Sequence, residues 1–585
     1  MQVRKSECTF TMFSAANPNF AKLQLVLTAI LILLILSFDT AAQSSNNKTR
    51  GKPGSVEIQA GDVVYYALER DTLMSIAKQF TDKTANWEVI GKRNQIGNER
   101  AIPIGFPILI SAELLTEEIV PARVAALAGT VTVISKNGKE EVVNLGAVLN
   151  EGAQITTGKN GFVTLALFDD SRVSIPSNSQ ALLAKLRATK FTKSPRTEIK
   201  LLDGRVESQV SKLDANKGRF EVRSKLAIAG VRGTHFRVGV NDNGIANEVL
   251  EGGVAVGQPE KPNAIVVPAG EGNIVSKSGV GKPVKLLPAP QLVDGYQLQS
   301  RPRLQFNLKA VDNALDYRAQ VTRDAQAQDI VAESMAQDLN VQFADIADGN
   351  YFLRVTAIDS NRLEGLPEVL AFTVKAKPEP PFPLAPKHKV RIASVEFKWT
   401  QNTEAQYYRL QVAQDQDFKQ IVLDQDQIRN VNWSTDKLAI GDYYWRIASV
   451  QETAINGVKK IDQGPYSNPQ NFKVLPGQST HPFTDNGNAN LEFTWPSEPG
   501  QRFLVQIASD PEFKKLLLNK DVAEAKVKMP RPESGVYYIR VRATDADRFI
   551  GAFSTPQKFE VGLHWTTGTG EALQSSGGKV TPSVK

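Results

Sequence analysis

The sequence predicts a mainly β-structured protein built from several domains. The chain has 585 residues, several times the usual domain length of ~100–200 residues, and 41% of them are hydrophobic. Segments in which apolar and polar residues alternate recur through its middle and C-terminal parts, as expected for half-buried strands. One short segment near the N-terminus has helical patterning instead. We therefore predict a small βααβ module, a β-rich middle domain and three antiparallel β-sandwiches in tandem.

The first 42 residues have the pattern of an export signal. Lys22 precedes an apolar run of 16 residues, Leu23–Phe38, and the small residues Thr40 and Ala42 follow it. The run is shorter than the ~20 residues that cross a bilayer comfortably. We expect residues 1–42 to be a cleaved signal peptide, with an uncleaved membrane anchor as the alternative. Either way, the rest of the chain is predicted to lie in the periplasm, free or anchored at the inner membrane.

Polar segments flank the part of the chain that is predicted to fold. Residues 43–55 (QSSNNKTRGKPGS) are rich in Gly, Pro and Ser, which is typical of a linker. Residues 563–585 contain almost no large apolar side chains, so we predict a disordered tail there.

Residues 56–115 are predicted to form the small module, with the element order β-α-α-β. Asp71 and Thr72 stand where they can cap a helix over residues 73–80, because their side-chain oxygens can accept its first backbone N–H groups. A Pro and Gly turn then leads into a final strand over residues 106–111.

This module resembles the LysM family, which binds glycans that contain N-acetylglucosamine, chiefly peptidoglycan. The resemblance rests on Asp71-Thr72-Leu73, Ile76-Ala77, Trp87, Asn94 and the Ile102-Pro103-Ile104-Gly105 turn. The sequence departs from the family pattern at Arg70, where the family usually has Gly, and at Met74, where it usually has an aromatic residue.

The resemblance implies a shallow sugar-binding groove between the loop that opens the first helix and the loop that closes the second. Carried over residue by residue, the glycan-binding residues are Asp71, Thr72, Leu73, Asn94, Gln95 and Ile96. The alternative is that Asp71 only caps a helix and Asn94 only forms a turn. Both roles are compatible with binding.

Residues 122–285 are predicted to be almost entirely β-structured. Short β-branched runs are separated by Gly, Asn and Asp turns, which indicates stacked hairpins or a solenoid-like sheet. The densest basic run of the chain, residues 184–200, lies in this domain, and we interpret it as a solvated loop face. Arg232, Thr234 and His235 combine charge, hydroxyl and imidazole, but their alternating pattern favours a strand.

The same stretch resembles the FecR domain. The residues that carry the resemblance are Gly152–Thr157, LFDDSRVSI (167–175), LLDGRV (201–206) and GVRGTHFRV (230–238). In FecR-type regulators such a domain follows a cytoplasmic anti-sigma segment and a membrane span. Only 22 residues precede the apolar run here, so we expect the anti-sigma role not to carry over. The ligand of this domain stays open.

Three homologous copies occupy the C-terminal half, at residues 291–376, 384–475 and 481–562. Each contains a strand that opens YRAQV, YRLQV or FLVQI, and a later strand that opens with Gly. The two openings lie 32, 33 and 32 residues apart in the three copies. The layout resembles fibronectin type III and related immunoglobulin-like sandwiches. The first copy has Leu308 where the others have Trp399 and Trp495, and we expect these residues to lie in the cores.

Composition argues against catalysis, metal binding and nucleic-acid binding. Four His residues are far apart, and Cys8 is the single cysteine, so we predict no metal site and no cofactor. No nucleophile motif, metalloprotease motif or phosphate-binding loop occurs, and we predict that the protein is not an enzyme. The net charge of +7 is spread along the chain, which does not favour a nucleic-acid partner.

The sequence therefore favours a non-catalytic periplasmic binder of peptidoglycan. Its FecR-like domain and its sandwiches would contact an unidentified envelope protein or act as a scaffold, and the membrane would be a partner only through an uncleaved N-terminal segment. The alternative is a membrane-anchored, envelope-sensing regulator related to FecR signal transducers.

Overall fold

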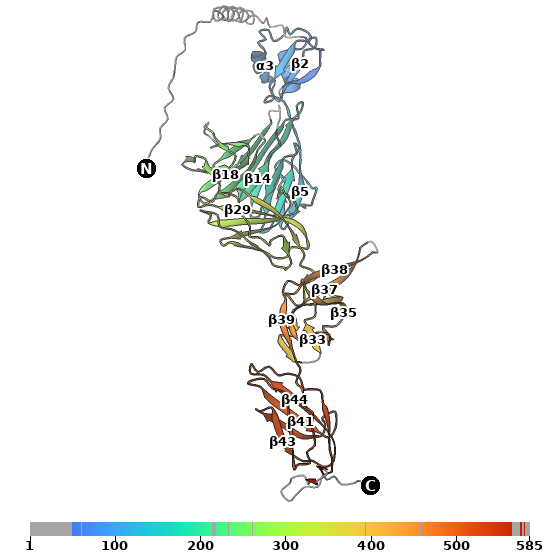
Figure 1. The fold of residues 1–585 in the computed structure, drawn as a ribbon. Helices are drawn as coiled ribbons and strands as arrows, with labels where there is room; N and C mark the ends of the chain where they lie inside the picture. The colour runs from blue at the N-terminus through green and yellow to red at the C-terminus, as the bar shows by residue number, and fades with distance from the viewer. Residues whose placement is uncertain are drawn as a thin grey trace, which may run out of the picture. The chain divides into compact units, whose positions relative to one another are not determined.

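The computed structural model describes residues 50–563, apart from residues 60, 213–217, 232, 260, 262, 392–393 and 456–457, together with two short C-terminal strands. The predicted signal peptide or anchor and most of the predicted tail lie outside these residues. The chain divides into two compact units, Met1–Lys285 and Leu286–Lys585, which are described separately (Figure 1). No helix in the described part is both long and apolar enough to span a membrane. The prediction of a mainly β-structured, multidomain protein is confirmed.

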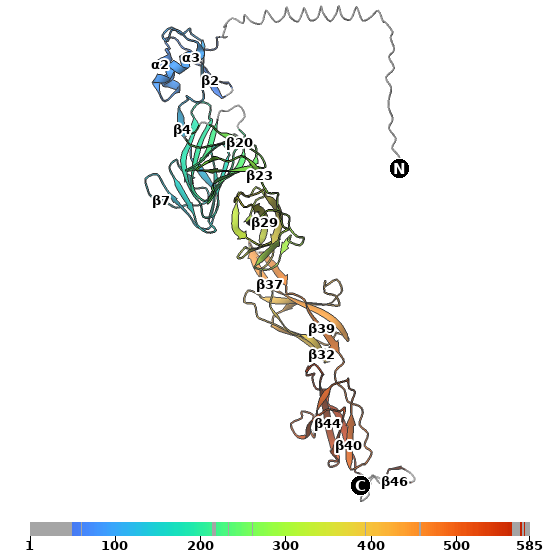
Figure 2. The same cartoon turned by 90° about the vertical axis from the view of Figure 1, so that its left-hand side faces the viewer.

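The N-terminal module, residues 56–115, packs its helices against an antiparallel sheet of order β1-β2-β3 (Figure 2). Its core joins both helices to β2 and β3, and Tyr65, Leu73 and Phe80 are among its buried residues. The β-α-α-β order is present, and β1 adds an edge strand before it. The elements are β1 Val56–Gln59, β2 Asp62–Tyr66, α2 Leu73–Phe80, the 3-10 helix η1 Thr84–Asn86, α3 Trp87–Asn94 and β3 Pro107–Ile110.

The end of the predicted linker 43–55 is bound to the module and is not free. The Gly51 N–H donates to the carbonyl oxygen of Gly105 at 3.1 Å, and the Gly54 N–H donates to that of Tyr66 at 2.7 Å. These are backbone interactions, so the polar composition of the segment gave no sign of them.

The middle domain, residues 122–285, is a two-layer β structure. Sheet C has the order β20-β19-β16-β15-β13-β12-β9-β6-β7, with β4 also paired to β12. Sheet D has the order β22-β21-β18-β17-β14-β11-β10-β5-β8, with β23 also paired to β21. Figure 2 shows β7 and β20 at opposite edges of the domain. The sequence predicted either stacked hairpins or a solenoid-like sheet. The observed domain has two sheets, and their strands pair mainly in the antiparallel direction.

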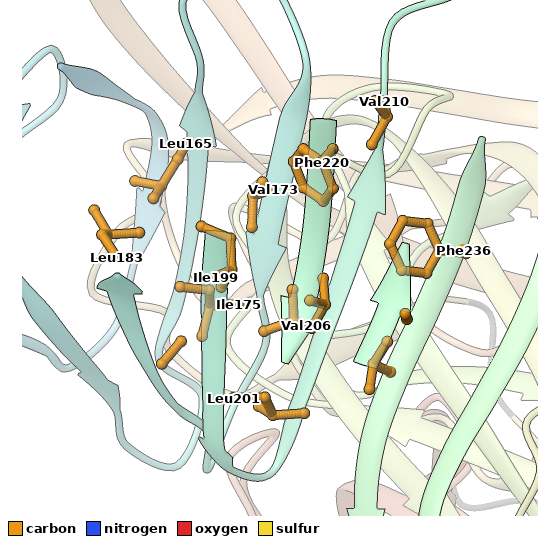
Figure 3. Packing of buried hydrophobic residues seen from close by; sticks show 14 of the residues in the cluster. Leu165, Val173, Ile175, Leu183, Ile199, Leu201, Val206, Val210, Phe220 and Phe236 are labelled. Atoms are coloured by element: carbon orange, nitrogen blue, oxygen red, sulfur yellow. The ribbon is translucent and has the colours of Figure 1, made fainter. Parts of the chain in front are cut away.

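The inner faces of sheets C and D share one apolar core (Figure 3). Ile199 and Phe220 project from sheet C, and Val206 and Phe236 project from sheet D. The rings of Phe220 and Phe236 meet edge to face at 6.2 Å between centroids, a favourable aromatic geometry. Apolar residues therefore occupy every second position of these strands, and the polar residues between them form the outer faces.

The strands of the middle domain and of the segment before it are β4 Glu117–Ile119, β5 Ala122–Ala128, β6 Val131–Ile134, β7 Glu140–Glu141, β8 Val148–Leu149, β9 Gln154–Thr157, β10 Phe162–Ala166, β11 Arg172–Ile175, β12 Gln180–Thr189, β13 Pro195–Asp203, β14 Arg205–Gln209, β15 Arg219–Arg223, β16 Ile228–Val231, β17 His235–Asn241, β18 Gly244–Glu251, β19 Gly253–Gly257, β20 Ile265–Pro268, β21 Glu271–Ser276, β22 Gly279–Val280 and β23 Val284–Lys285.

The basic run 184–200 is a β-hairpin that contacts the N-terminal module, so its interpretation as a solvated loop is wrong. It belongs to the paired strands β12 and β13, and the ring of Phe191 in their turn lies 4.7 Å from that of Phe80 in the module. The Thr116 N–H donates to the Phe80 carbonyl at 2.9 Å, and the Lys190 N–H donates to the Thr116 carbonyl at 2.8 Å. The module and the middle domain therefore share a packed junction.

The second unit contains the three sandwiches. The first pairs a sheet of order β24-β30-β29-β26-β27 with β25-β28, the second pairs β32-β39-β37-β34-β35 with β31-β33-β36, and the third pairs β42-β41-β44-β45 with β40-β43. Trp399, Trp495 and Leu308 are buried in the three cores, as the sequence predicted. In the first copy, the Phe306 ring packs on Phe372 at 4.9 Å within the core that Leu308 joins.

The strands of the second unit are β24 Leu298–Gln299, β25 Leu304–Asn307, β26 Asp316–Thr322, β27 Ile330–Ala336, β28 Asn340–Phe343, β29 Gly349–Ile358, β30 Glu368–Val374, β31 Pro383–Ala385, β32 His388–Arg391, β33 Val395–Trp399, β34 Tyr407–Ala413, β35 Ile421–Ile428, β36 Asn432–Thr435, β37 Gly441–Ile455, β38 Val458–Tyr466, β39 Gln470–Leu475, β40 Asn490–Thr494, β41 Arg502–Ala508, β42 Leu516–Val522, β43 Lys526–Pro530, β44 Gly535–Thr544, β45 Gln557–Val561, β46 Gln574–Ser575 and β47 Gly578–Lys579.

Gly204, in the turn between β13 and β14, is expected to be required for the middle domain. Its φ is +71°, and a Cβ there would lie 2.4 Å from the Asn178 carbonyl oxygen. Gly270 has φ +79° with nothing within 4 Å of such a Cβ. Gly270→Ala should cost about 1 kcal/mol for the left-handed backbone, whereas Gly204→Ala should cost about 3 kcal/mol. Amide exchange in β13 and β14 measures both, and equal effects would contradict the steric argument.

Phe191 is expected to stabilise the N-terminal module, although it belongs to the middle domain. Phe191→Ala removes the ring that packs on Phe80, so the free energy of opening of the module should fall by about 2–3 kcal/mol. Faster amide exchange in α2 would report this loss. Phe168→Ala is the control, because its side chain is 49% exposed, and it should leave α2 unchanged. Unchanged exchange in the Phe191 variant would show that the module does not depend on the junction.

Candidate functional site

The two loops that the resemblance assigns to a sugar groove lie side by side in the N-terminal module. The Leu73 N–H, at the start of α2, donates to the carbonyl oxygen of Glu99 at 3.0 Å, and Glu99 belongs to the loop after α3. The Ile96 N–H donates to the Gly91 carbonyl at 3.0 Å, which turns this loop back over the end of α3. Main-chain contacts thus set the distance between the loops.

The Asp71 carboxylate holds its own loop. It accepts the Tyr65 hydroxyl and the Leu68 N–H, both at 2.7 Å. Burial, together with the hydrogen bond to Asp71 and the charge of Asp71, raises the pKa of Tyr65 to about 12. Asp71 was predicted to cap α2, but its oxygens accept from the preceding loop and from the Ser75 hydroxyl at 3.3 Å.

Thr72 is the residue that caps α2. Its hydroxyl oxygen accepts the Ser75 N–H at 3.1 Å, and the Ser75 hydroxyl oxygen accepts the Thr72 N–H at 2.9 Å. This reciprocal capping box satisfies donors that a helix start leaves without partners. Leu73 follows with its side chain 1% exposed. The start of α2 is therefore held by its cap, and Leu73 turns little side-chain surface to solvent, whereas Met74 is 45% exposed.

Asn94 joins α3 to β3, and its side chain is 3% exposed. Its amide group donates to the carbonyl oxygens of Ile90 at 2.9 Å and Leu109 at 2.8 Å, and its oxygen accepts the Leu109 N–H at 2.8 Å. Such a buried, hydrogen-bonded amide has a structural role. The next residue, Gln95, ends the helix in the left-handed conformation with φ 58°.

A shallow hollow of about 360 Å³ lies beside these loops. Of the six predicted residues, Leu73 and Ile96 line it. The sequence reasoning missed the face of α3 that completes it, namely Trp87, Glu88, Val89, Gly91 and Lys92. Gly91 could have indicated this face of α3, because glycine inside a helix is unfavourable unless it allows close packing. A Cβ at Gly91 would lie 2.8 Å from Leu73 Cδ1, so the glycine permits α3 to approach α2.

The arrangement offers a ligand main-chain groups and an apolar floor, with Glu88 and Lys92 at the margin of the hollow. Within the described residues, no group of three or more His, Cys, Asp and Glu is placed to hold a metal ion.

The combination Arg232, Thr234 and His235 in the middle domain does not assemble into a site in the described residues. Arg232 lies outside them. The Thr234 hydroxyl donates to the Gly253 carbonyl at 3.2 Å, and the His235 Nε2 lies 2.7 Å from a carboxylate oxygen of Glu207. His235 begins β17 and contacts its neighbour β14, in agreement with the strand interpretation, whereas Thr234 lies just before the strand.

Comparison with protein families matches the family described as FecR protein to residues 153–255. This stretch lies inside the middle domain, so the FecR resemblance of that domain is confirmed. A comparison with curated proteins gives no match.

Solved structures with some likeness include two of a putative anti-sigma factor from Parabacteroides distasonis. Each is 22% identical and covers 23% of this chain, with TM-scores of 0.19 and 0.18. The match spans 58% of the length of those anti-sigma factor chains. A third, of the FN1–FN3 domains of chicken CNTN1, is 11% identical and covers 47% of this chain and 98% of that one, with a TM-score of 0.18.

The Tyr65 hydroxyl predicts that the module loses stability at alkaline pH. The pKa of Tyr65 in the folded chain, about 12, lies above its ordinary value of 10.0. A raised pKa favours the protonated folded state, so this contribution is complete below about pH 10 and is lost as the pH rises through about 12. Thermal unfolding followed by circular dichroism should show the loss across this window. Tyr65→Phe should not show it, and an equal loss in that variant would refute the assignment.

Proposed function

We propose that this chain is a non-catalytic protein of the bacterial cell envelope that binds peptidoglycan, or another glycan containing N-acetylglucosamine, through its N-terminal module. The observation that supports this most is the contact between the loop before α2 and the loop after α3, made through Leu73 and Glu99. The two loops border one shallow hollow, and its floor includes Leu73 and Ile96. The acetamido groups of the glycan would meet main-chain groups there, and the sugar rings would lie on the apolar floor.

The proposal includes a location in the periplasm. Residues 1–42 would direct export and then be cleaved, or would remain as an inner-membrane anchor. The middle domain and the sandwiches would present surfaces to another envelope protein. A shallow groove binds weakly, so attachment to an insoluble polymer would depend on many such chains or many glycan repeats.

A second candidate function is a membrane-anchored sensor of the envelope. The match to the FecR family over residues 153–255 favours it, as does the junction at Phe191, because a ligand on the module would be joined mechanically to the middle domain. This function requires that residues 23–38 stay in the membrane. Determination of the mature N-terminus distinguishes the two, since cleavage near Gln43 would remove the span.

The binding proposal is tested by sedimentation of the purified full chain with insoluble peptidoglycan and by titration with N-acetylglucosamine oligomers. The full chain is needed because Phe191 contributes to the core of the module. Gly97 follows Ile96, and a Cβ there would meet nothing within 4 Å, so Gly97→Arg should cover the hollow without disturbing the core. Gln79→Arg, at an exposed position of α2, is the matched control.

We expect the wild-type chain and the Gln79→Arg variant to sediment with peptidoglycan, and the Gly97→Arg variant to remain in solution. Asn94 is unsuitable for this test, because removal of its buried amide would destabilise the fold. Absence of binding by the wild-type chain at low ionic strength would refute the proposal. Equal binding by both variants would show that the binding site lies outside the hollow.

A further inference from the structure

The middle domain has a second, larger groove on the outer face of sheet C. It has a volume of about 860 Å³ and is lined on one side by charged residues of β13 and β15, among them Arg196, Glu198, Arg219, Glu221 and Arg223. We call it the charged groove. Glu113 and Glu117, in the segment that leaves the N-terminal module, also line it, so it begins where the two domains join.

The strand register places like charges opposite one another in this groove. β13 and β15 are parallel, with Arg196 opposite Arg219 and Glu198 opposite Glu221. Like charges directly across a strand pair destabilise a sheet. Ion pairs form along β15, where Glu221 accepts from both Arg219 and Arg223, and diagonally between the strands, where the Arg223 Nε lies 3.3 Å from a Glu198 carboxylate oxygen. A pattern that opposes stability locally is expected where a surface has a function.

Glu221 and Glu117 are largely covered in the groove, whereas Arg219 is open to solvent. The Glu221 side chain is 9% exposed, whereas that of its partner Arg219 is 66% exposed. Glu117, 17% exposed, accepts the ammonium group of Lys185 at 2.7 Å. A ligand entering the groove can therefore reach the Arg219 guanidinium, which favours carboxylate oxygens through charge-assisted hydrogen bonds.

The floor of the groove has almost no side chains. Gly230 of β16 and Gly253 and Ala255 of β19 form it, and Val266 of β20, 67% exposed, stands at its far side. The nearest atom to a Cβ at Gly230 would be the Ala255 carbonyl oxygen at 4.0 Å. Such a floor permits close approach of an extended backbone whose side chains are small, since it neither fills the space nor provides an aromatic surface for a sugar ring.

We propose that the charged groove binds an extended peptide with free carboxylates and methyl-sized side chains. Carboxylates of the peptide pair with Arg219 and Arg223, and its small side chains lie over Gly230 and Ala255. The peptide stems of peptidoglycan, which combine alanine with glutamate and a diamino acid, have this chemistry. The choice of peptidoglycan as the source of the peptide rests on the proposed function of the module. The proposal that the groove binds such a peptide does not depend on that function. The chain then binds the glycan and the peptide of one polymer through two adjacent domains.

The test is calorimetric titration of the full chain with a free stem tetrapeptide, L-Ala-γ-D-Glu-diaminopimelate-D-Ala, and separately with an N-acetylglucosamine oligomer. Arg219→Gln removes an exposed cation of the groove, and Lys159→Gln removes an exposed cation of the same domain that does not line it. Ala255→Phe fills the floor from an exposed position. We expect Arg219→Gln to weaken the affinity for the tetrapeptide about tenfold, Ala255→Phe to abolish binding, and Lys159→Gln to have no effect.

A thermal-unfolding readout separates recognition from structure. Arg219→Gln removes the like charge opposite Arg196 but also one of the two cations that pair with Glu221. Arg223 keeps its pair with Glu221, so the transition of the unliganded variant should change little, although its affinity falls. A marked fall would assign Arg219 a structural role, and retained binding by Ala255→Phe would then overturn the site.

The two proposals fail separately. Wild-type chain that binds the sugar oligomer but not the tetrapeptide overturns the charged groove alone, and the reverse result overturns the module site alone. If neither Arg219→Gln nor Ala255→Phe changes the affinity for the tetrapeptide, the peptide does not bind in the charged groove.

Discussion

The contact between Phe191 and Phe80 is the constraint on which the first unit depends. A module of about 60 residues buries too small a fraction of its surface to be more than marginally stable alone. Here the β12–β13 hairpin inserts an aromatic ring into that module while its strands take part in sheet C. The same hairpin therefore completes one core and builds another, and the hollow of the module and the charged groove belong to one packed unit.

This sharing of structure also limits which groups are available for recognition. In the N-terminal module, Asp71, Thr72 and Asn94 direct their side chains to backbone groups of the module itself. They fix the loops, and the hollow beside them is lined by Leu73, Ile96 and one face of α3. In the charged groove the side chains themselves form the recognition surface, because their neighbours on the floor are glycine and alanine. This difference in chemistry is the reason that we propose a neutral sugar for the hollow and a charged peptide for the groove.

Local patterns predicted the fold well, and pairings between distant segments could not be predicted. The helix at 73–80 and the buried Trp399 and Trp495 follow from periodicity and from repeats, which depend on near neighbours in sequence. The hairpin at 184–200 was misread because Phe191 is a single ring among Lys and Thr, and no period marks it as buried. The strands β13 and β15 are parallel and are separated in the chain by a crossover. The sequence pattern therefore does not show that Arg196 and Arg219 lie opposite each other. Asn94 was found as a motif residue, but its partners on β3 appear only in the folded chain.

The three sandwiches share a backbone yet differ in the chemistry of one face. In each, an Asp accepts backbone N–H groups of the loop that follows β26, β34 or β41, as Asp415 and Asp510 do in the second and third copies. In those copies the guanidinium of Arg446 lies 3.9 Å from the Phe418 ring centroid, and Arg540 lies 4.0 Å from that of Phe513.

The first sandwich has Ala327 at the position of those phenylalanines, with the same left-handed backbone at φ 56°. The loop geometry therefore does not require the aromatic ring, since a methyl group occupies it equally well. The arginine that stacks on the ring in the second and third copies has a counterpart in the first, Arg354, which is 3% exposed and donates to the Gln320 side-chain oxygen at 3.4 Å. The copies therefore share the arginine and differ in the side chain beside it. Repetition has thus kept the core and the loop while the outer face changed, which is expected if the copies act as a common spacer whose individual faces meet different neighbours.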